Sequence, residues 1–447
     1  MSTSRQMEQL DKIKATAGDR NRRILLAGAH VVTMDDRGEF VGDVLIEGDR
    51  IEALGPGIAD RVHDNAIAVD LSGSILIPGL VDSHVHAWQG QLRGIAPDVS
   101  FAEYMALLHG RLGKAYRPED MAIGERLTAA QALNAGTTTI VDNSHNSRTK
   151  QHSDAAVEAL RASGIRAVYA AGPAHEGDHE HQLPADVLRL RDAYSSADGL
   201  ISVRMMDSWP TVESWTFAAE HGLDVSSEVG GWVTDLEKLL TSGLLSSAHT
   251  LNHCSGLSDE CWAAIADSGA AVNVVPRSDS HLGLGASIPI LEVNRRGIQE
   301  GISSDNEVAY GHDLFTEMRV LQTIQRGLSF AETYSGVADV PAPYGALDAL
   351  RAATIGGAIN AGLADQVGTL APGKKADLVV LALEPVQTRI SGSAAGTVVN
   401  FAGIANVDAV FVNGAVAKWG GQLTGFDYGK LARDGEDSKH YLFDHSR

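Results

Sequence analysis

Short apolar runs recur between residues 75 and 305, and stretches with helical periodicity separate them. Eight runs have the length and composition of buried strands: 75–81, 137–142, 165–171, 201–206, 223–228, 245–253, 270–275 and 301–305. Helices are predicted between them, for example over 117–135, 154–163, 212–221 and 258–268. Strands that alternate with helices indicate βα units around a parallel sheet, and eight units favour the (β/α)8 TIM barrel of the α/β class over an open sheet.

The two ends of the chain share a different pattern. Short β-rich runs with turn residues occupy 24–33, 41–47 and 50–54, and similar runs return at 376–381 and 407–417. Such runs are typical of a small sheet domain. The 447 residues fit this division, because a barrel takes about 250 residues and leaves room for one small domain.

Composition and charge narrow the class of protein. The chain carries 36 Lys and Arg against 57 Asp and Glu, a net charge of -21, which disfavours nucleic acid and anionic membranes as partners. The first 23 residues lack the apolar segment of a signal peptide, and no apolar run is long enough to span a bilayer. Two cysteines cannot make a disulfide framework. We therefore expect a soluble, cytoplasmic protein.

A pair of histidines follows the first predicted barrel strand. His84 and His86 are two positions apart, so in an extended chain both imidazoles point to the same face. Two imidazoles at this spacing can bind one metal ion. For the pair alone, two polar residues in a loop after the strand is the favoured interpretation.

Other predicted strands also end in residues that can bind metal. Glu228 ends the fifth strand, His253 the sixth and Asp305 the eighth. Barrels place their chemistry at the carboxyl ends of the strands. Three histidines, a glutamate and an aspartate there form a nitrogen and oxygen ligand set that suits a divalent ion.

Five segments of the chain resemble the amidohydrolase superfamily, in particular the branch with cytosine deaminases and triazine hydrolases. They are IPGLVDSHVH at 77–86, NAGTTT at 134–139, LNHC at 251–254, SD at 304–305 and GTLAPGKKADL at 368–378. The resemblance implies a (β/α)8 barrel with a small β-sandwich assembled from both chain ends. The expected divisions are a polar extension (1–22), the β-sandwich (23–74 and 368–425), the barrel (75–367) and a C-terminal tail (426–447).

The resemblance also implies roles for single residues. His84 and His86 match the metal ligands of the first strand, His253 the histidine of the sixth and Asp305 the aspartate of the eighth. The expected cofactor is one divalent ion, zinc before iron or manganese. Asp305 is the expected base that takes a proton from a metal-activated water, and His253 would orient that water or polarise the substrate oxygen.

One position departs from the family pattern, because no histidine lies between His221 and His249, where the family has a ligand on the fifth strand. In one alignment Glu228 takes the place of that histidine, and a carboxylate can ligate zinc. In the other, Val225 takes its place and Glu228 is the acid that protonates a substrate ring nitrogen. We favour the first alignment, since valine cannot bind a metal and Val229-Gly230 matches relatives that read His-Val-Gly.

Candidate substrate contacts follow the first two barrel strands. Trp88 and Gln89 come after the histidine pair, in the loop where a barrel contacts its substrate. Trp88 could stack on a substrate or form a lid contact. His145 follows the second strand and could reach the site, although a solvated loop histidine is the simpler interpretation.

A polar cluster, Arg277 to His281, follows the seventh strand. Arg277 and His281 are candidate substrate contacts, and the guanidinium suits a carboxylate. A purely structural pair of Arg277 with Asp279 is the alternative. The histidine-rich stretch GPAHEGDHEH at 172–181 is expected to be a solvated loop without a catalytic role.

The predicted function is a metal-dependent amidohydrolase that hydrolyses a C–N bond. The substrate is a small molecule or modified peptide, either an amide or amidine or an amino group on a nitrogen heterocycle. Without the His-x-x-Glu pattern, the amide or amidine is favoured over a deaminase of a nucleobase-like ring. The alternative from another class is a metal-free relative that acts as a binding module. The resemblance further implies a homo-oligomer.

Overall fold

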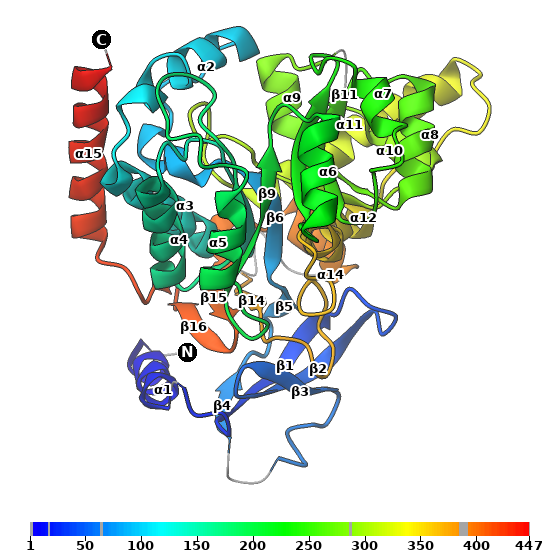
Figure 1. The fold of residues 1–447 in the computed structure, drawn as a ribbon. Helices are drawn as coiled ribbons and strands as arrows, with labels where there is room; N and C mark the ends of the chain where they lie inside the picture. The colour runs from blue at the N-terminus through cyan, green and yellow to red at the C-terminus, as the bar shows by residue number, and fades with distance from the viewer. Residues whose placement is uncertain (1–2, 17, 63–65, 286–287, 384–391, 447) are drawn as a thin grey trace.

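The strands of the chain form two separate sheets, one above the other in Figure 1. This computed structural model describes residues 3–16, 18–62, 66–285, 288–383 and 392–446. Helices surround the larger sheet, while the smaller sheet lies below it and is built from both ends of the chain.

The larger sheet is a parallel (β/α)8 barrel, as the sequence predicts. Its strands follow one another in chain order: β6 (Leu80–Val85), β7 (Thr137–Ser144), β8 (Arg166–Ala171), β9 (Ile201–Asp207), β10 (Val225–Gly230), β11 (His249–Ser255), β12 (Ala271–Val274) and β13 (Glu300–Ile302). A parallel bridge between Val85 and Asp305 joins the last strand to the first. The Asp305 amide donates to the His84 carbonyl at 2.9 Å, and the His86 amide donates to the Asp305 carbonyl at 2.9 Å.

The smaller sheet is mixed and has nine strands. They are β1 (Arg23–Val32), β2 (Glu39–Glu47), β3 (Arg50–Gly55), β4 (Ile67–Asp70), β5 (Ile75–Pro78), β14 (Leu378–Leu381), β15 (Val407–Val412), β16 (Ala415–Trp419) and β17 (Gln422–Leu423). β5 joins the two chain ends, because it pairs with β1 on one side and β14 on the other. A core of its own, with Ile24, Val44 and Phe411, supports this sheet.

The helices complete the βα units and cap the chain ends. They are α1 (Thr3–Ala15), α2 (Phe101–Leu108), α3 (Pro118–Asn134), α4 (Lys150–Ser163), α5 (Asp186–Tyr194), α6 (Val212–Glu220), α7 (Leu236–Leu240), α8 (Asp259–Ser268), α9 (Pro276–Leu282), α10 (Ile290–Arg295), α11 (Leu314–Tyr334), α12 (Ala346–Arg351), α13 (Gly357–Asn360), α14 (Ala394–Asn400) and α15 (Tyr428–His445). Three short 3₁₀ helices in the described chain are η1 (Ala87–Leu92), η2 (Leu112–Ala115) and η4 (Ile404–Asn406), and η3 (Ala352–Gly356) is a π-helical segment. The predicted helices correspond to α3, α4, α6 and α8. Among the described residues, no helix has the length and apolar character needed to cross a bilayer.

The run 75–81, predicted as one barrel strand, is divided between the two sheets. β5 ends at Pro78, and β6 begins at Leu80. Gly79 lies at the crossing, where an added Cβ would collide with the side chain of Thr138. The first barrel strand thus begins and ends later than predicted, and His84 lies within it.

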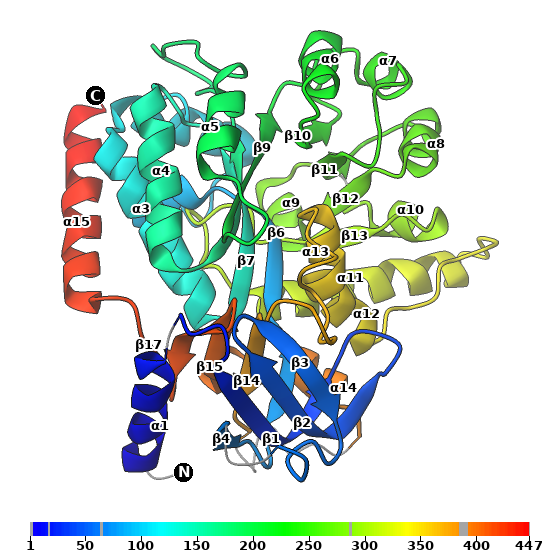
Figure 2. The same ribbon diagram turned by 60° about the horizontal axis from the view of Figure 1, so that its bottom comes forward.

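The polar start and the tail of the chain both form helices in the structure (Figure 2). Ile13 of α1 is buried in the core of the smaller sheet. α15 lies along the outside of the barrel beside α3, and its Leu442 is fully buried. Arg117 lies over the ring of Tyr441 at 3.5 Å. α1 therefore packs on the smaller sheet, and α15 packs on α3 outside the barrel.

A buried ion pair links the two sheets. Arg166 begins β8, and Asp377 directly precedes β14. The guanidinium donates to both carboxylate oxygens, at 2.8 and 2.9 Å, and the side chains are 2% and 1% exposed. Asp377 also accepts from the amide of Asn413 at 2.7 Å.

Asp377→Ala is expected to lower the free energy of unfolding by about 3–5 kcal/mol, because it leaves the Arg166 charge buried without a partner. Urea denaturation followed by circular dichroism measures the loss. The matched control removes a half-exposed pair, Arg23 with Glu52, and Glu52→Ala should cost less than about 1 kcal/mol. Equal losses of unfolding free energy in the two variants would show that the buried pair of Arg166 with Asp377 contributes no more than an exposed one.

Candidate metal centre and active-site cavity

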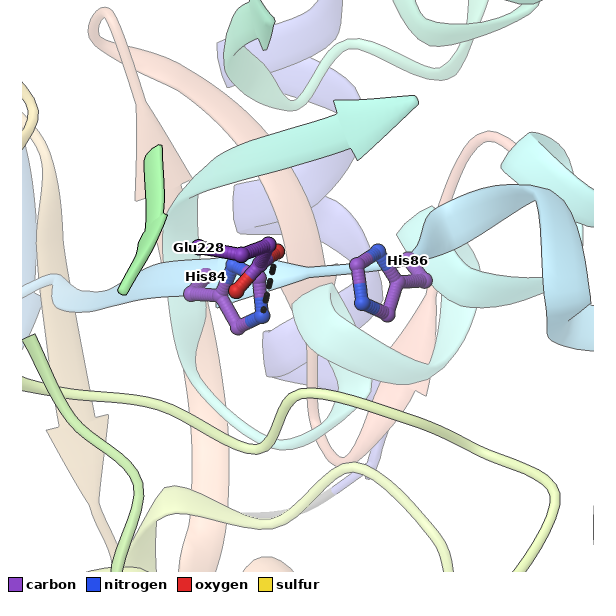
Figure 3. Close-up of side chains that lie close together, drawn as sticks. All are labelled: His84, His86 and Glu228. Atoms are coloured by element: carbon purple, nitrogen blue, oxygen red, sulfur yellow. Dashed lines mark ion pairs between the residues drawn. The ribbon is translucent and has the colours of Figure 1, made fainter. Parts of the chain in front are cut away.

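Five residues that can bind metal meet at the carboxyl ends of the barrel strands. His84 lies on β6 and His86 directly follows it; Glu228 lies on β10, His253 on β11, and Asp305 follows β13. Figure 3 shows His84 and His86 along one ribbon, with the Glu228 carboxylate beside the His84 ring. Two overlapping groups could hold an ion: His84 with His86 and Glu228, and His84 with His253 and Asp305.

The distances show that imidazoles and carboxylates alternate in this group. Asp305 Oδ1 lies 3.1 Å from Nε2 of both His84 and His86. Glu228 Oε2 lies 3.0 Å from His253 Nε2, and its Oε1 lies 3.6 Å from His84 Nε2. All three histidines thus turn the same ring nitrogen, Nε2, toward the carboxylates.

The other ring nitrogen, Nδ1, of each histidine has a partner behind the site. His86 Nδ1 lies 2.8 Å from the carbonyl oxygen of Asn143, and His253 Nδ1 lies 2.6 Å from Asp279 Oδ1. His84 Nδ1 lies 2.5 Å from the side-chain amide of Asn143. Partners of this kind set the ring orientation of metal-bound histidines and leave Nε2 for the ion.

Two of these residues have an unusual backbone conformation at the end of a strand. His253 and Asp305 have φ of +67° and +64°, in the left-handed region that residues other than glycine rarely adopt. The pairing of β10 with β11 shifts between Val229 and Gly230, next to His253. Local strain of this kind is concentrated at functional sites.

The two carboxylates are charged although they are buried. Burial would raise the pKa of Glu228, but the charges of His84 and His253 bring it down to about 2. Burial acts in the same way on Asp305, yet hydrogen bonds and charges from His84 and His86 hold its pKa well below the usual range. Neither Glu228 oxygen makes a hydrogen bond of good geometry with the described residues. A buried carboxylate without such partners is suited to a cation, so the donor set fits a divalent ion.

The register of the sheet separates the two candidate positions for the fifth-strand ligand. Val225 pairs with His249 at the start of β10, whereas Val229 pairs with His253. Val225 therefore lies at the opposite end of the strand from the metal ligands, and Glu228 lies beside them. This geometry favours the alignment in which Glu228 replaces a histidine.

A cavity opens above the five residues. Its lining includes His86, Glu228, His253 and Asp305 at the centre. The rest of the lining is Phe101, Tyr104, Met105, His109, His145, His175, Ser208, Trp209, Trp232, Leu282 and Leu284. The cavity combines imidazoles with aromatic and aliphatic side chains.

Of the predicted substrate contacts, the structure places only His145 in the described lining of this cavity. Trp88 is fully buried behind it and contacts the rings of His145 and Tyr116. Gln89 is also buried and donates to the hydroxyl of Tyr104 at 2.7 Å. Both therefore support lining residues.

Arg277 and His281 lie outside the described lining. Arg277 donates to Glu317 at 2.7 Å and to the Gly311 carbonyl at 3.0 Å, so its charge is already paired. The alternative pair of Arg277 with Asp279 is wrong, because Asp279 holds His253. His281 is exposed, and its Nε2 lies 2.6 Å from the carbonyl oxygen of Pro97.

Sequence reasoning missed Asn143, His109 and His175. The stretch 172–181, expected to be a loop without a role, supplies His175 to the cavity. Its three histidines were the available signal, but only one lines the cavity. His109 follows the helix α2, so a search of the carboxyl ends of the barrel strands does not find it.

Comparison with known proteins identifies the family. The profile of the amidohydrolase family matches residues 75–220 and 214–417. The chain belongs to the amidohydrolase family. This membership confirms the expected enzyme class, a hydrolase that acts on carbon–nitrogen bonds.

Relatives of similar length align along nearly the whole chain. A 5-methylthioadenosine/S-adenosylhomocysteine deaminase of Desulforudis audaxviator is 26% identical over 445 residues, which cover 94% of this chain and 99% of the relative. A 5'-deoxyadenosine deaminase of Methanothermobacter thermautotrophicus is 27% identical over 436 residues, with coverage of 90% and 95%.

Solved structures of two enzymes share the fold of this amidohydrolase. A zinc-bound adenosine deaminase of Xanthomonas campestris has a TM-score of 0.82 and 23% identity, and the match covers 94% of this chain and 98% of that one. A zinc complex of atrazine chlorohydrolase from Arthrobacter aurescens has a TM-score of 0.80 and 23% identity, with coverage of 94% and 100%.

Asp279→Asn is expected to weaken zinc binding by about 10–100-fold, because the amide holds His253 Nδ1 less firmly than the carboxylate does. Competition with a chromophoric chelator measures the affinity. Asp154→Asn on α4, where Asp154 pairs with Arg189, is the matched control and should leave zinc affinity unchanged. An unchanged affinity in Asp279→Asn would show that Asp279 does not support a metal ligand.

Proposed function

We propose that this chain is a zinc-dependent aminohydrolase that replaces the amino group of a nitrogen heterocycle with oxygen and releases ammonia. The observation that carries the proposal is the convergence of three imidazole Nε2 atoms and two charged, buried carboxylates at the base of one cavity.

The metal proposal rests on the donor set and on zinc in the related structures. His84, His86, Glu228, His253 and Asp305 would hold one ion, with Glu228 in the place of the family's fifth-strand histidine. When bound, such an ion lowers the pKa of a water molecule toward neutrality and polarises the bond under attack. Because Glu228 is a carboxylate in the place of an imidazole, the net positive charge of the ion with its ligands is lower than it would be with a histidine there.

Asp305 is the proposed base. Its Oδ2 accepts a hydrogen bond from the Ser278 hydroxyl, and its Oδ1 faces His84 and His86. The carboxylate is therefore held beside two of the proposed metal ligands, and in the proposal the attacking water lies next to it. It can take the proton of the water and pass it to the leaving nitrogen, as a base that becomes an acid.

The choice of an amino heterocycle rests on the relatives and on the cavity. The relatives that align over the whole chain are named as deaminases of adenosine derivatives. Phe101, Trp209 and Trp232 give the cavity aromatic surfaces against which a planar ring can pack. Of the two branches expected from the sequence, these observations favour the ring deaminase over the amide or amidine hydrolase.

Glu228→Ala should lose zinc, because it removes a ligand, whereas Glu228→His should retain it. Val225→Ala, at the far end of β10, is the matched control and should keep full zinc content. Metal analysis of purified protein after zinc repletion measures all three variants. If Glu228→Ala kept one equivalent of zinc, Glu228 would not be a ligand, and a wild-type protein without zinc would support the metal-free binding module instead.

Asp305→Asn should lower the rate of ammonia release by about 10²–10⁴-fold, the usual contribution of a general base. The assay uses 5'-deoxyadenosine and 5'-methylthioadenosine, with ammonia detected by a coupled enzyme and rates expressed per bound zinc. Ser446→Ala, at the end of α15 and outside the described lining of the cavity, serves as the control. Full turnover in Asp305→Asn would overturn the assignment of the base.

A further inference from the structure

A second group of histidines lines the outer part of the cavity. His109 follows α2, His145 follows β7 and His175 lies in the loop after β8. Their ring centroids are 4.7 Å apart for His109 and His145, 4.3 Å for His109 and His175, and 4.6 Å for His145 and His175. His145 also stacks on the candidate ligand His86 at 4.0 Å. The three rings thus continue directly from the metal centre.

The nitrogen atoms of this trio have unused hydrogen-bonding capacity. His109 Nε2, His145 Nδ1 and both ring nitrogens of His175 have no hydrogen-bond partner among the described residues. His109 and His145 are each only 2% exposed. Buried polar atoms are normally satisfied, so these atoms are suited to a ligand that enters the cavity.

Two observations disfavour a second metal ion on the trio. The rings of His109 and His175 are stacked at 22°, which sets their nitrogens side by side rather than around one point. Within the described chain, the groups that could hold an ion are those at the metal centre.

The histidines of the trio are uncharged. Burial lowers the pKa of His109 and brings that of His175 to about 4, so both are neutral near pH 7. A neutral imidazole offers one donor and one acceptor.

The outer cavity contains no fixed charge among its described lining residues. The carboxylates Glu228 and Asp305, and the histidines that face them, all belong to the metal centre rather than to the outer cavity. Arg148 is close by, but its guanidinium donates to the carbonyls of Gly113, Asp178 and Glu176. Arg277 is paired with Glu317. A carboxylate in the outer cavity would therefore lose its water without gaining a cation.

The remaining lining is apolar and reaches the surface at Trp209. Phe101 lies 5.8 Å from Trp232 between ring centroids, and Leu282 and Leu284 complete this part of the wall. Trp209 contacts His175 at 5.9 Å and is 52% exposed, which places it at the mouth. The outer cavity thus combines apolar surface with neutral hydrogen-bonding groups.

We propose that the outer cavity selects amino heterocycles with an electrically neutral substituent and rejects those whose substituent carries an amino-acid group. The unpaired imidazole nitrogens bind the polar atoms of the neutral substituent, and the apolar wall takes the rest. This substrate class rests on the proposed aminohydrolase function.

The relatives' names supply a matched pair of probes. 5'-Methylthioadenosine ends in a methyl group on sulfur, whereas S-adenosylhomocysteine carries a charged amino-acid group on the same sulfur. With the zinc-loaded protein, kcat/KM should favour 5'-methylthioadenosine by about 100-fold, because burial of the unpaired charges opposes the other substrate. Values within threefold of each other would overturn the proposal.

A binding experiment separates this proposal from the proposed function. In the zinc-loaded Asp305→Asn protein, quenching of tryptophan fluorescence reports occupancy, since Trp209 and Trp232 line the cavity. If the zinc-loaded wild-type protein releases no ammonia from either substrate, the aminohydrolase proposal fails. The titration of the Asp305→Asn protein then decides the selectivity alone. Binding of 5'-methylthioadenosine at least about 30-fold tighter than S-adenosylhomocysteine supports it. Equal binding, or no binding of the neutral probe, overturns it.

A variant that adds a positive charge to the outer cavity gives the most direct test of the proposal. His175→Arg introduces a cation into the outer cavity and should improve the relative affinity for S-adenosylhomocysteine by about tenfold. His440→Arg makes the same substitution on α15, where the side chain is 72% exposed, and should leave the ratio unchanged. An unchanged ratio in His175→Arg, with thermal melting like that of the wild type, would contradict the proposed position of the substituent.

Discussion

The structure of the active site depends on the hydrogen bonds that close the barrel. The backbone of Asp305 pairs with that of His84 and His86, and the same three residues contribute side chains to the metal centre. The contact that joins the last strand to the first therefore also sets the distance between a candidate base and two candidate ligands. Because the barrel closes there, a displacement of β13 relative to β6 would disturb the fold and the chemistry together.

Charge balance is the second constraint on this site. Glu228 and Asp305 are buried next to three imidazoles, and each histidine is oriented through its other ring nitrogen. A divalent ion would balance the charges of Glu228 and Asp305, while the outer cavity adds no charged residue in the described lining. The described lining of the outer cavity therefore offers no counter-charge to a charged substituent, which is the physical basis of the substrate selectivity that we propose.

Much of the fold was predictable because each βα unit has its own local signals. The helix α8 begins after Ser258, whose hydroxyl accepts from the Cys261 amide, and it ends at Gly269 with φ of +75°, as the capping residues indicate. The division of the run 75–81 was not predictable, since both of its halves are apolar and only pairing partners distinguish them. Arg277 was equally ambiguous, because its partner Glu317 lies 40 residues away.

The sequence by itself determined the barrel and the residues at its strand ends, because strand periodicity and parallel connectivity bring those ends to one face. It left open whether Glu228 or Val225 occupies the ligand position, and the tertiary structure favours Glu228 through the register of β10 against β11. Only the folded chain brought His109, His145 and His175 together, from three separate loops. Contacts between loops depend on the path of the whole chain, and no local pattern of residues encodes that path.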